Sequence, residues 1–246
     1  MAVAPSMSTD QALPTGLYGK VPAHGDFVTH GLPADFIKPW DQWLGRWVVH
    51  AKDTFDQSFQ LIYLTSPVWC FALDPKVAGE QAWVGALATS VDSHQRPFPI
   101  TLALAVPPNK SAVDLAELCE PLTNDLQELC FAAIDGGVDW DVLVMRLQEI
   151  RQKLQASPSN RFDFNDKFGA TRARLIRGIH APPVQALSGL FNRSPQRSSS
   201  AIACWWHAGT AERPPEAIRS VGLPPMEAML GLLSGDWTEQ GWATGA

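Results

Sequence analysis

The sequence has few cysteines, and none is placed for cross-linking or for a metal ribbon. Its 246 residues include four, Cys70, Cys119, Cys130 and Cys204, and no two of them form a Cys-x-x-Cys pair. A disulfide framework or a zinc ribbon needs closely spaced cysteines, so neither organises this chain. Each cysteine stands among apolar residues, which predicts buried, reduced thiols.

The chain also lacks an excess of basic residues. Lys and Arg total 19 against 25 Asp and Glu, which gives a net charge of -6. Proteins that bind nucleic acid or anionic membranes usually present a basic surface, so we expect neither as a partner.

Targeting and membrane signals are missing from the sequence as given. The first ten residues contain no basic segment followed by an apolar one, so they do not resemble a signal peptide. Apolar stretches stay well short of the roughly 20 residues that span a bilayer. We therefore expect a cytoplasmic protein without direct membrane insertion.

Familiar catalytic motifs are absent as well. The sequence has no Gly-x-x-x-x-Gly-Lys-Ser/Thr phosphate loop, no dinucleotide-binding Gly-x-Gly-x-x-Gly and no Gly-x-Ser-x-Gly nucleophile elbow. Catalytic groups need not be close in sequence, so this absence favours a non-enzymatic protein without deciding it. We expect no cofactor.

The hydrophobic pattern of the first half predicts a strand over 16–21, a helix and three further strands. Pro39 suits the first turn of the helix, and apolar residues at spacings of three and four continue it to residue 55. The further strands are expected over 68–73, 83–91 and 98–106. The short polar connection between the last two predicts an antiparallel hairpin.

The second half is predicted to begin with helices. Ser111 and Asp114 form a capping-box pattern at the start of the first. Pro121 should kink or split that helix, and Gly136 should end it. Another helix is expected over 139–154.

These elements, with a helical piece over 181–191, a strand over 201–206 and a helix over 225–233, predict an α/β fold. We expect a three-layer sandwich, in which a mixed, largely antiparallel sheet is covered by helices on both faces. Residues 1–15 are predicted to form a flexible leader, and residues 16–246 a single domain.

A turn after the first strand holds one group of candidate functional residues, Gly25, Asp26 and Phe27. His24 and Asp26 lie two apart in this turn, and together with Asp92 they are candidates for an acid–base or metal site. Their spacing matches no recognised ligand pattern. A simpler interpretation is that Asp26 caps local backbone N–H groups.

Asp92 and Arg96, in the predicted hairpin loop, form the second group. A bidentate Arg–carboxylate pair between them would fix the shape of the loop. The loop is then either part of a docking surface or simply rigid, and the sequence leaves both open.

Trp40, Asp41 and Trp43, near the start of the predicted helix, form the third group. An aspartate in the first turn of a helix is favoured by the helix dipole, which accounts for Asp41. Core packing is the simpler interpretation of the tryptophans, whereas an exposed ridge would mark a partner site.

Together these segments resemble the TagF (ImpM) family of bacterial proteins. The family carries Gly-Lys-Leu-Pro-x-x-Gly-Asp-Phe, then Trp-Asp-x-Trp-Leu, then Ser-Val-Asp-x-x-Gly-Arg-x-Phe-Pro-Leu-Thr. The corresponding residues here are Gly19–Pro22 with Gly25–Phe27, Trp40–Leu44 and Ser90–Thr101. Gln95 stands where the family usually has glycine, which takes positive φ more readily.

The resemblance implies a cytoplasmic accessory protein of the type VI secretion system. Such a protein is expected to be a non-enzymatic, post-translational repressor of assembly that binds the system's forkhead-associated scaffold protein. The resemblance also allows contacts with the pathway's serine/threonine kinase and phosphatase, since some relatives are fused to that phosphatase.

Three hypotheses make different structural predictions. A regulatory binding protein should show an exposed patch that combines a tryptophan of the helix with the 25–27 turn and the 92–96 loop. A hydrolase or metal-dependent enzyme should bring His24, Asp26 and Asp92 into one cleft. A structural subunit of the secretion machine would need a large apolar surface for self-association.

Overall fold

A single sheet organises the part of the protein that the computed structural model describes, which is residues 13–156, 173–177, 201–237 and 243–244. The nine strands found there run in the order β2-β1-β5-β4-β3-β7-β8-β6-β9. Neighbours are antiparallel except for the parallel pair β6–β9. The predicted helix over 181–191 lies outside the described residues.

The strands are β1 (Thr15–Gly19), β2 (Val28–His30), β3 (Trp69–Leu73), β4 (Ala82–Ala88), β5 (Ile100–Val106), β6 (Ala173–Arg177), β7 (Ile202–His207), β8 (Glu216–Val221) and β9 (Ala243–Thr244). The helices are α1 (Ala34–Phe55), α2 (Phe59–Leu64), α3 (Ala112–Cys119), α4 (Thr123–Asp135), α5 (Trp140–Ala156) and α7 (Met226–Ser234), with single 3-10 turns at Asp56–Ser58 and Glu120–Leu122.

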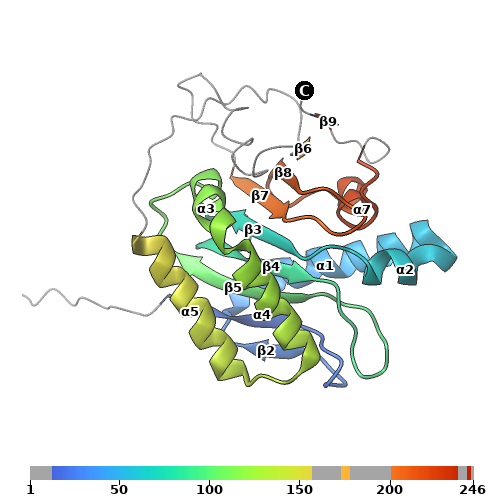
Figure 1. The fold of residues 1–246 in the computed structure, drawn as a ribbon, viewed down its shortest axis with the longest axis horizontal. Helices are drawn as coiled ribbons and strands as arrows, with labels where there is room; N and C mark the ends of the chain where they lie inside the picture. The colour runs from blue at the N-terminus through green and yellow to red at the C-terminus, as the bar shows by residue number, and fades with distance from the viewer. Residues whose placement is uncertain (1–12, 157–172, 178–200, 238–242, 245–246) are drawn as a thin grey trace, which may run out of the picture.

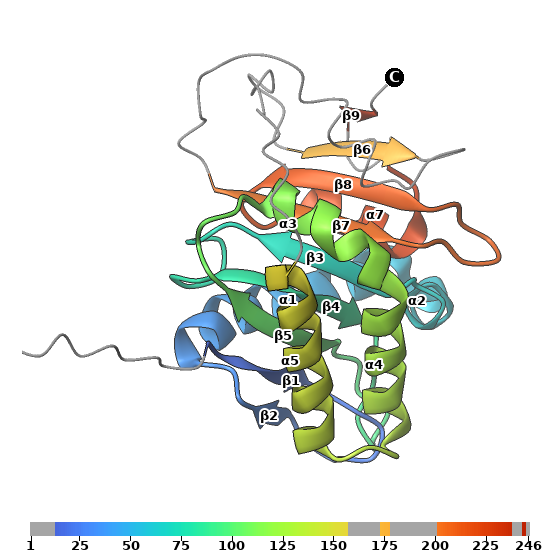
Figure 2. The ribbon, with the colours of Figure 1, turned by 60° about the vertical axis from the view of Figure 1, so that its left-hand side comes forward.

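Helices cover both faces of the sheet, which confirms the predicted three-layer α/β sandwich. Helices α3, α4 and α5 pack on one face, and α1, α2 and α7 on the other (Figures 1 and 2). Within these described residues, no helix combines the length and the apolarity needed to cross a bilayer.

The two faces have different cores because side chains alternate along each strand. In β4, Val84 and Ala86 point to the α3–α5 side, whereas Trp83 and Leu87 point to the α1/α7 side. The first core is mostly aliphatic. It also holds the four free cysteines, all of them buried, as predicted. The second core is rich in tryptophan.

Helix α1 starts earlier than its sequence suggested. It begins at Ala34, with Pro33 at the N-cap position, so Pro39 lies inside the helix and not in its first turn. The acidic residue of the first turn is therefore Asp35, and the expected dipole role of Asp41 is wrong.

The predicted start, break and end of the α3–α4 segment are confirmed. Ser111 and Asp114 form the reciprocal capping box, and Pro121 lies in the 3-10 turn that separates α3 from α4. Gly136 ends α4 with φ of 68°, a conformation that glycine adopts at little cost.

Other segments also differ from the sequence-based expectation, and α2, β6 and β9 were not predicted. Thr15, assigned to the leader, is instead the first residue of β1 and is buried. Strand β2 has only three residues, too few for a recognisable pattern. Strand β8 was missed because Glu216 and Arg219 are buried in it and hide the expected apolar alternation.

Candidate functional site

Asp92 is the centre of a compact hydrogen-bonded loop between β4 and β5. Its side chain is fully buried. Oδ1 accepts the backbone N–H groups of His94 and Arg96, each at 2.9 Å. Oδ2 accepts Nζ of Lys20 at 3.0 Å and Nε of Arg96 at 2.6 Å. The predicted Asp92–Arg96 pair is therefore present, and Lys20 of the β1 segment joins it.

These contacts keep Asp92 ionised. Burial alone would raise the pKa of Asp92, but hydrogen bonds from the backbone of Arg96, from the Lys20 and Arg96 side chains and from the backbone of His94 hold it well below its usual value. A carboxylate in this state exchanges no proton near neutral pH. Asp92 is therefore a fixed negative charge that holds its neighbours.

Gln95 adopts the left-handed conformation that the family's glycine would favour. Its φ is 61°, and its backbone N–H donates to the carbonyl oxygen of Asp92 at 2.9 Å. This conformation costs a non-glycine residue about 1–2 kcal/mol. The hydrogen bonds to Asp92 offset that cost, so the replacement of glycine has not removed the loop geometry.

The β4–β5 loop is fastened to the turn after β1. Nη2 of Arg96 donates to the carbonyl oxygen of Gly25 at 2.6 Å. The backbone N–H of Ser93 donates to the carbonyl oxygen of His24 at 2.9 Å. Two segments about 70 positions apart in the chain thus form one unit, which we call the loop cluster (residues 20–27 and 90–98).

An aromatic group connects the loop cluster to α1. Phe27 stacks on Tyr18 with ring centroids 5.6 Å apart and meets Phe98 edge to face at 4.7 Å. The Lys20 ammonium lies 5.0 Å from the Phe27 ring centroid. The Tyr18 hydroxyl donates to Oδ1 of Asp41 at 2.6 Å, which is the actual role of this aspartate.

The structure thus brings six predicted residues together: Gly25, Asp26, Phe27, Asp41, Asp92 and Arg96. The sequence analysis did not single out Tyr18, Lys20 and Phe98. A signal was available, because Tyr18 and Lys20 are two positions apart in the predicted strand over 16–21 and so would share a face.

Trp40 and Trp43 do not belong to an exposed surface, which removes them from the candidate partner-binding residues. Both are buried. Nε1 of Trp40 donates to Oγ1 of Thr101 at 2.8 Å, and Nε1 of Trp43 donates to the carbonyl oxygen of Pro224 at 3.0 Å. Their rings pack against Trp205 in the aromatic core. Core packing, the simpler interpretation, is the correct one.

The three residues of the enzyme hypothesis do not converge on a cleft. Asp26 is exposed, and its Oδ1 accepts the N–H of the next residue, Phe27, at 2.8 Å. The ring of His24 lies 5.7 Å from that of Trp140, and Asp92 is occupied by its four donors. In the described ranges, no three His, Cys, Asp or Glu side chains are grouped as metal ligands. The geometry gives no support to an acid–base or metal-binding set made of these residues.

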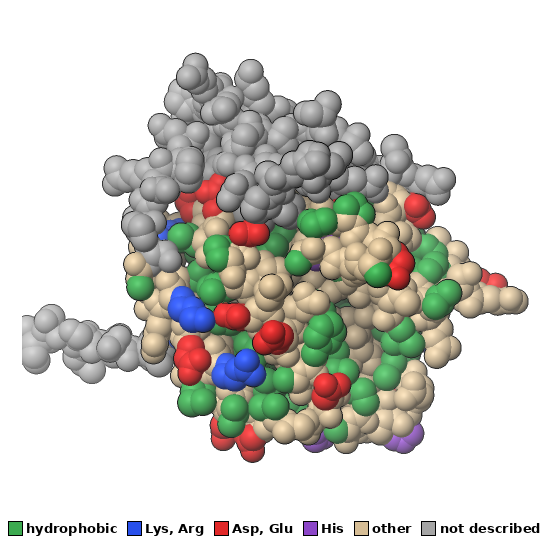
Figure 3. Space-filling model, in the orientation of Figure 1, with side chains coloured by type: hydrophobic (Ala, Val, Ile, Leu, Met, Phe, Trp, Pro, Cys, Tyr) green, Lys and Arg blue, Asp and Glu red, His purple; other side chains and the backbone are tan. Residues whose placement is uncertain are grey.

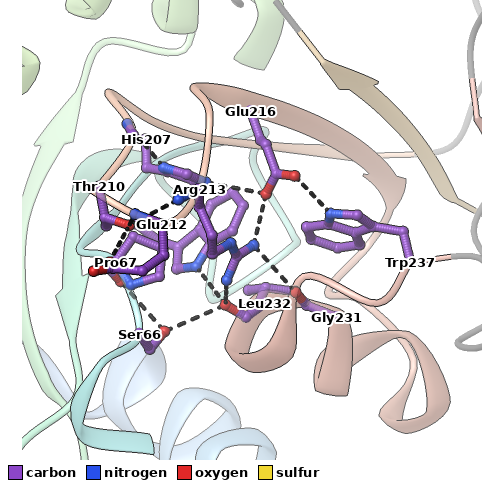
Figure 4. Close-up of polar contacts among 12 residues, drawn as sticks. Ser66, Pro67, His207, Thr210, Glu212, Arg213, Glu216, Gly231, Leu232 and Trp237 are labelled. Atoms are coloured by element: carbon purple, nitrogen blue, oxygen red, sulfur yellow. Dashed lines mark hydrogen bonds and ion pairs between the residues drawn. The ribbon is translucent and has the colours of Figure 1, made fainter. Parts of the chain in front are cut away.

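A second buried carboxylate, Glu216, has no counterpart in the sequence analysis. It is the first residue of β8, and Figure 4 shows its side chain between the β7–β8 connection and α7. Oε2 accepts Nη2 of Arg213 at 2.6 Å and Nε2 of His207 at 3.1 Å. Oε1 accepts Nε1 of Trp237 at 2.9 Å. We call these four residues the Glu216 network.

The hydrogen bonds define the state of His207. Its Nδ1 accepts the backbone N–H of Gly209 at 3.0 Å, so the proton of the neutral ring is on Nε2 and points at Glu216. Burial lowers the pKa of His207 more than Glu216 raises it. For Glu216 itself, burial would raise the pKa, but His207 and Arg213 lower it to about 2. The network is therefore a neutral histidine beside an Arg–Glu ion pair.

Arg213 also caps the C-terminal end of α7. Its Nη1 donates to the carbonyl oxygens of Leu232 and Leu233, each at 3.0 Å, groups that the helix itself leaves unpaired. Trp237 packs so closely on Gly231 that a Cβ there would lie 2.5 Å from the ring. The Glu216 network thus locks β7, β8 and α7 together, and its arrangement is structural.

The fold defines an α/β protein whose three-layer sandwich carries the loop cluster at one rim of the sheet. Residues 16–150, more than half of the chain, match the family described as the TagF N-terminal domain, type VI secretion system-associated. The chain belongs to this family, and the segments of the loop cluster all fall within the matched residues.

A solved structure is similar to this chain over most of its length. The crystal structure of PA0076 from Pseudomonas aeruginosa PAO1 is similar with a TM-score of 0.65 and 28% sequence identity. The similarity covers 90% of this chain and 94% of that one. No curated protein gave a match.

Proposed function

We propose that this protein is a non-enzymatic, cytoplasmic negative regulator of type VI secretion, acting after translation. In this proposal it binds the forkhead-associated scaffold protein of the system and thereby limits assembly of the secretion machine. The pathway's serine/threonine kinase and phosphatase are further candidate partners. Family membership provides the process, and the loop cluster provides the argument for binding.

One observation carries the proposal: the charged groups of the family motifs are used to hold a surface in shape. Asp92, Lys20 and Arg96 satisfy one another and the backbone of two loops. A pre-ordered surface loses little conformational entropy on association, which favours specific binding. A catalytic site would instead need a group left available to the substrate with a suitable pKa.

The proposal is tested by mixing the purified protein with the purified scaffold protein and measuring complex formation by size-exclusion chromatography and calorimetry. We expect a complex. In cells, a raised level of the protein should reduce the number of assembled secretion machines while leaving the transcripts of their components unchanged. Absence of a complex together with unchanged assembly would reject the proposal.

A further inference from the structure

Phe27 and Arg96 form the exposed centre of the loop cluster. Phe27 keeps 40% of its surface exposed, and the Arg96 side chain keeps 58%. The residues beside them, from Pro22 to Asp26 and from Ser93 to Gln95, are exposed as well. We call the exposed surface of 22–27 and 93–96 the Phe27 surface.

The orientation of Phe27 is fixed before any partner arrives. Tyr18 stacks on its ring, Phe98 meets it edge to face, and the Lys20 ammonium lies near it. Aromatic residues and arginine dominate the energetics of protein interfaces. An exposed ring whose side-chain entropy is already lost is well suited to anchor a partner.

Arg96 offers hydrogen-bond donors of known direction. A guanidinium has five N–H groups. One of them binds Asp92 and another binds the Gly25 carbonyl oxygen. The two bonds fix the plane of the group, and the side chain that carries the other N–H groups is 58% exposed. The nearby acid Asp26 turns Oδ1 to the backbone N–H of Phe27.

Arg96 favours an acidic group on the partner at its own position, although Asp26 brings the formal charge of the loop cluster as a whole to zero. Lys20 and Arg96 are both bound to the single carboxylate of Asp92, which leaves one excess positive charge in this triad. Lys20 is buried, so the exposed cation is Arg96. Arginine forms strong, charge-assisted hydrogen bonds with a carboxylate.

The backbone of the loop is strained next to these side chains. Gln95 takes a φ of 61°, although a non-glycine residue avoids this region. Strain of this kind persists where the surroundings enforce it, and it is concentrated at functional sites. Here it turns the chain so that Arg96 reaches both Asp92 and Gly25.

We propose that the Phe27 surface is the docking site for the scaffold protein of the proposed function, on which this inference rests. Phe27 enters an apolar pocket of the scaffold, and a carboxylate at the rim of that pocket pairs with Arg96. Asp92 is a positioning residue, because it holds Lys20 and Arg96 without reaching the surface.

The test is calorimetric titration of the purified scaffold protein with four variants of the full chain. Phe27→Ala should weaken binding at least about thirtyfold, as expected of an interface hot spot. Phe131→Ala is the matched control, since Phe131 is 48% exposed on α4, and it should change the affinity less than about twofold. Thermal unfolding shows that each variant is folded.

The charge prediction uses position 95, where both replacements keep the same backbone cost. Gln95→Glu places a carboxylate beside Arg96 and should weaken binding about fivefold to tenfold. Gln95→Lys should bind as well as the unchanged protein or better. This pair tests the surface even if Phe27→Ala does not fold.

The outcomes separate the two proposals. If the unchanged protein does not bind the scaffold, the proposed function fails and this inference fails with it. If it binds, but Phe27→Ala and Gln95→Glu bind equally well, the function stands and the docking site is elsewhere. Equal effects of Gln95→Glu and Gln95→Lys would reject the acidic group on the partner.

Discussion

The loop cluster and the Glu216 network solve the same physical problem with opposite consequences. Each surrounds one buried carboxylate with an arginine and further nitrogen donors. At Asp92 the arginine side chain is 58% exposed, whereas at Glu216 it is 13% exposed. The first arrangement shapes a surface and the second joins three elements inside the fold.

The two networks also differ in their position, one at the rim of the sheet and the other inside the fold. Figure 3 shows acidic, basic and apolar side chains interspersed on the α4/α5 face, with histidines along the lower edge, where Figure 1 places the connections of the loop cluster. The loop cluster lies at this rim of the sheet, whereas His207 and Glu216 are each 1% exposed. A buried ion pair can therefore shape a surface or join elements inside the fold, depending on which of its partners reaches solvent.

The largest expected effect is on stability, from Glu216→Gln. The amide nitrogen would face either Trp237 or the pair Arg213 and His207, which are all donors, and the arginine would lose its carboxylate. Breaking a buried pair in this way costs about 3–5 kcal/mol. Denaturant unfolding measures the loss. Glu212→Gln, at the exposed position before Arg213 in the chain, is the control and should change the free energy of unfolding little.

Lowering the pH should reduce the free energy of unfolding through the Glu216 network. Because the folded pKa values of Glu216 and His207 are lowered, their stabilisation is present above their usual pKa values and is lost as the pH falls. The His207 contribution declines below about 6.5. The Glu216 contribution declines between 4.5 and about 2, a loss of about 3 kcal/mol.

This pH dependence is measured as the gap in unfolding free energy between the unchanged protein and Glu216→Gln. The gap should narrow as the pH falls from 5 toward 3. For Asp92→Asn the corresponding narrowing should begin only below the ordinary aspartate pKa of 3.8. Gaps that stay constant with pH would show that these carboxylates are not held ionised by their partners.

A small gain in stability is expected from Gln95→Gly. Glycine removes the cost of the left-handed conformation but makes the unfolded chain more flexible, so the net gain is about 0.5–1 kcal/mol. Ser93→Gly, in the same loop but without positive φ, should destabilise. If Gln95→Gly also destabilised the protein, the strain assigned to this residue would be wrong.

The sequence predicted the elements whose signals are local. The β4–β5 hairpin, the Ser111 capping box and the break at Pro121 were all foreseen, because each depends on neighbouring residues. Strand β8 was not, because its polar residues are buried through contacts with distant ones. Glu216, for example, is satisfied by Trp237, and their contact cannot be seen in a linear pattern.

The candidate site was foreseen in part for the same reason. Asp92 and Arg96 are four residues apart, so their pairing was predictable from spacing. The hydrogen bond from Arg96 to the Gly25 carbonyl oxygen depends on β1 lying next to β5, which is a property of the whole sheet. The burial of Trp40 and Trp43 depends likewise on Thr101 and Pro224 as acceptors.

The central claim is that the loop cluster serves binding, whereas the Glu216 network serves stability. Its most direct test is the dissociation constant of the scaffold complex for Asp92→Asn and Glu216→Gln, each measured where the variant is fully folded. We predict that Asp92→Asn weakens binding about tenfold, because Arg96 and Lys20 lose the charge that positions them. Glu216→Gln should bind within about twofold of the unchanged protein. Equal affinities for the two variants would contradict the assignment of binding to the loop cluster and of stability to the Glu216 network.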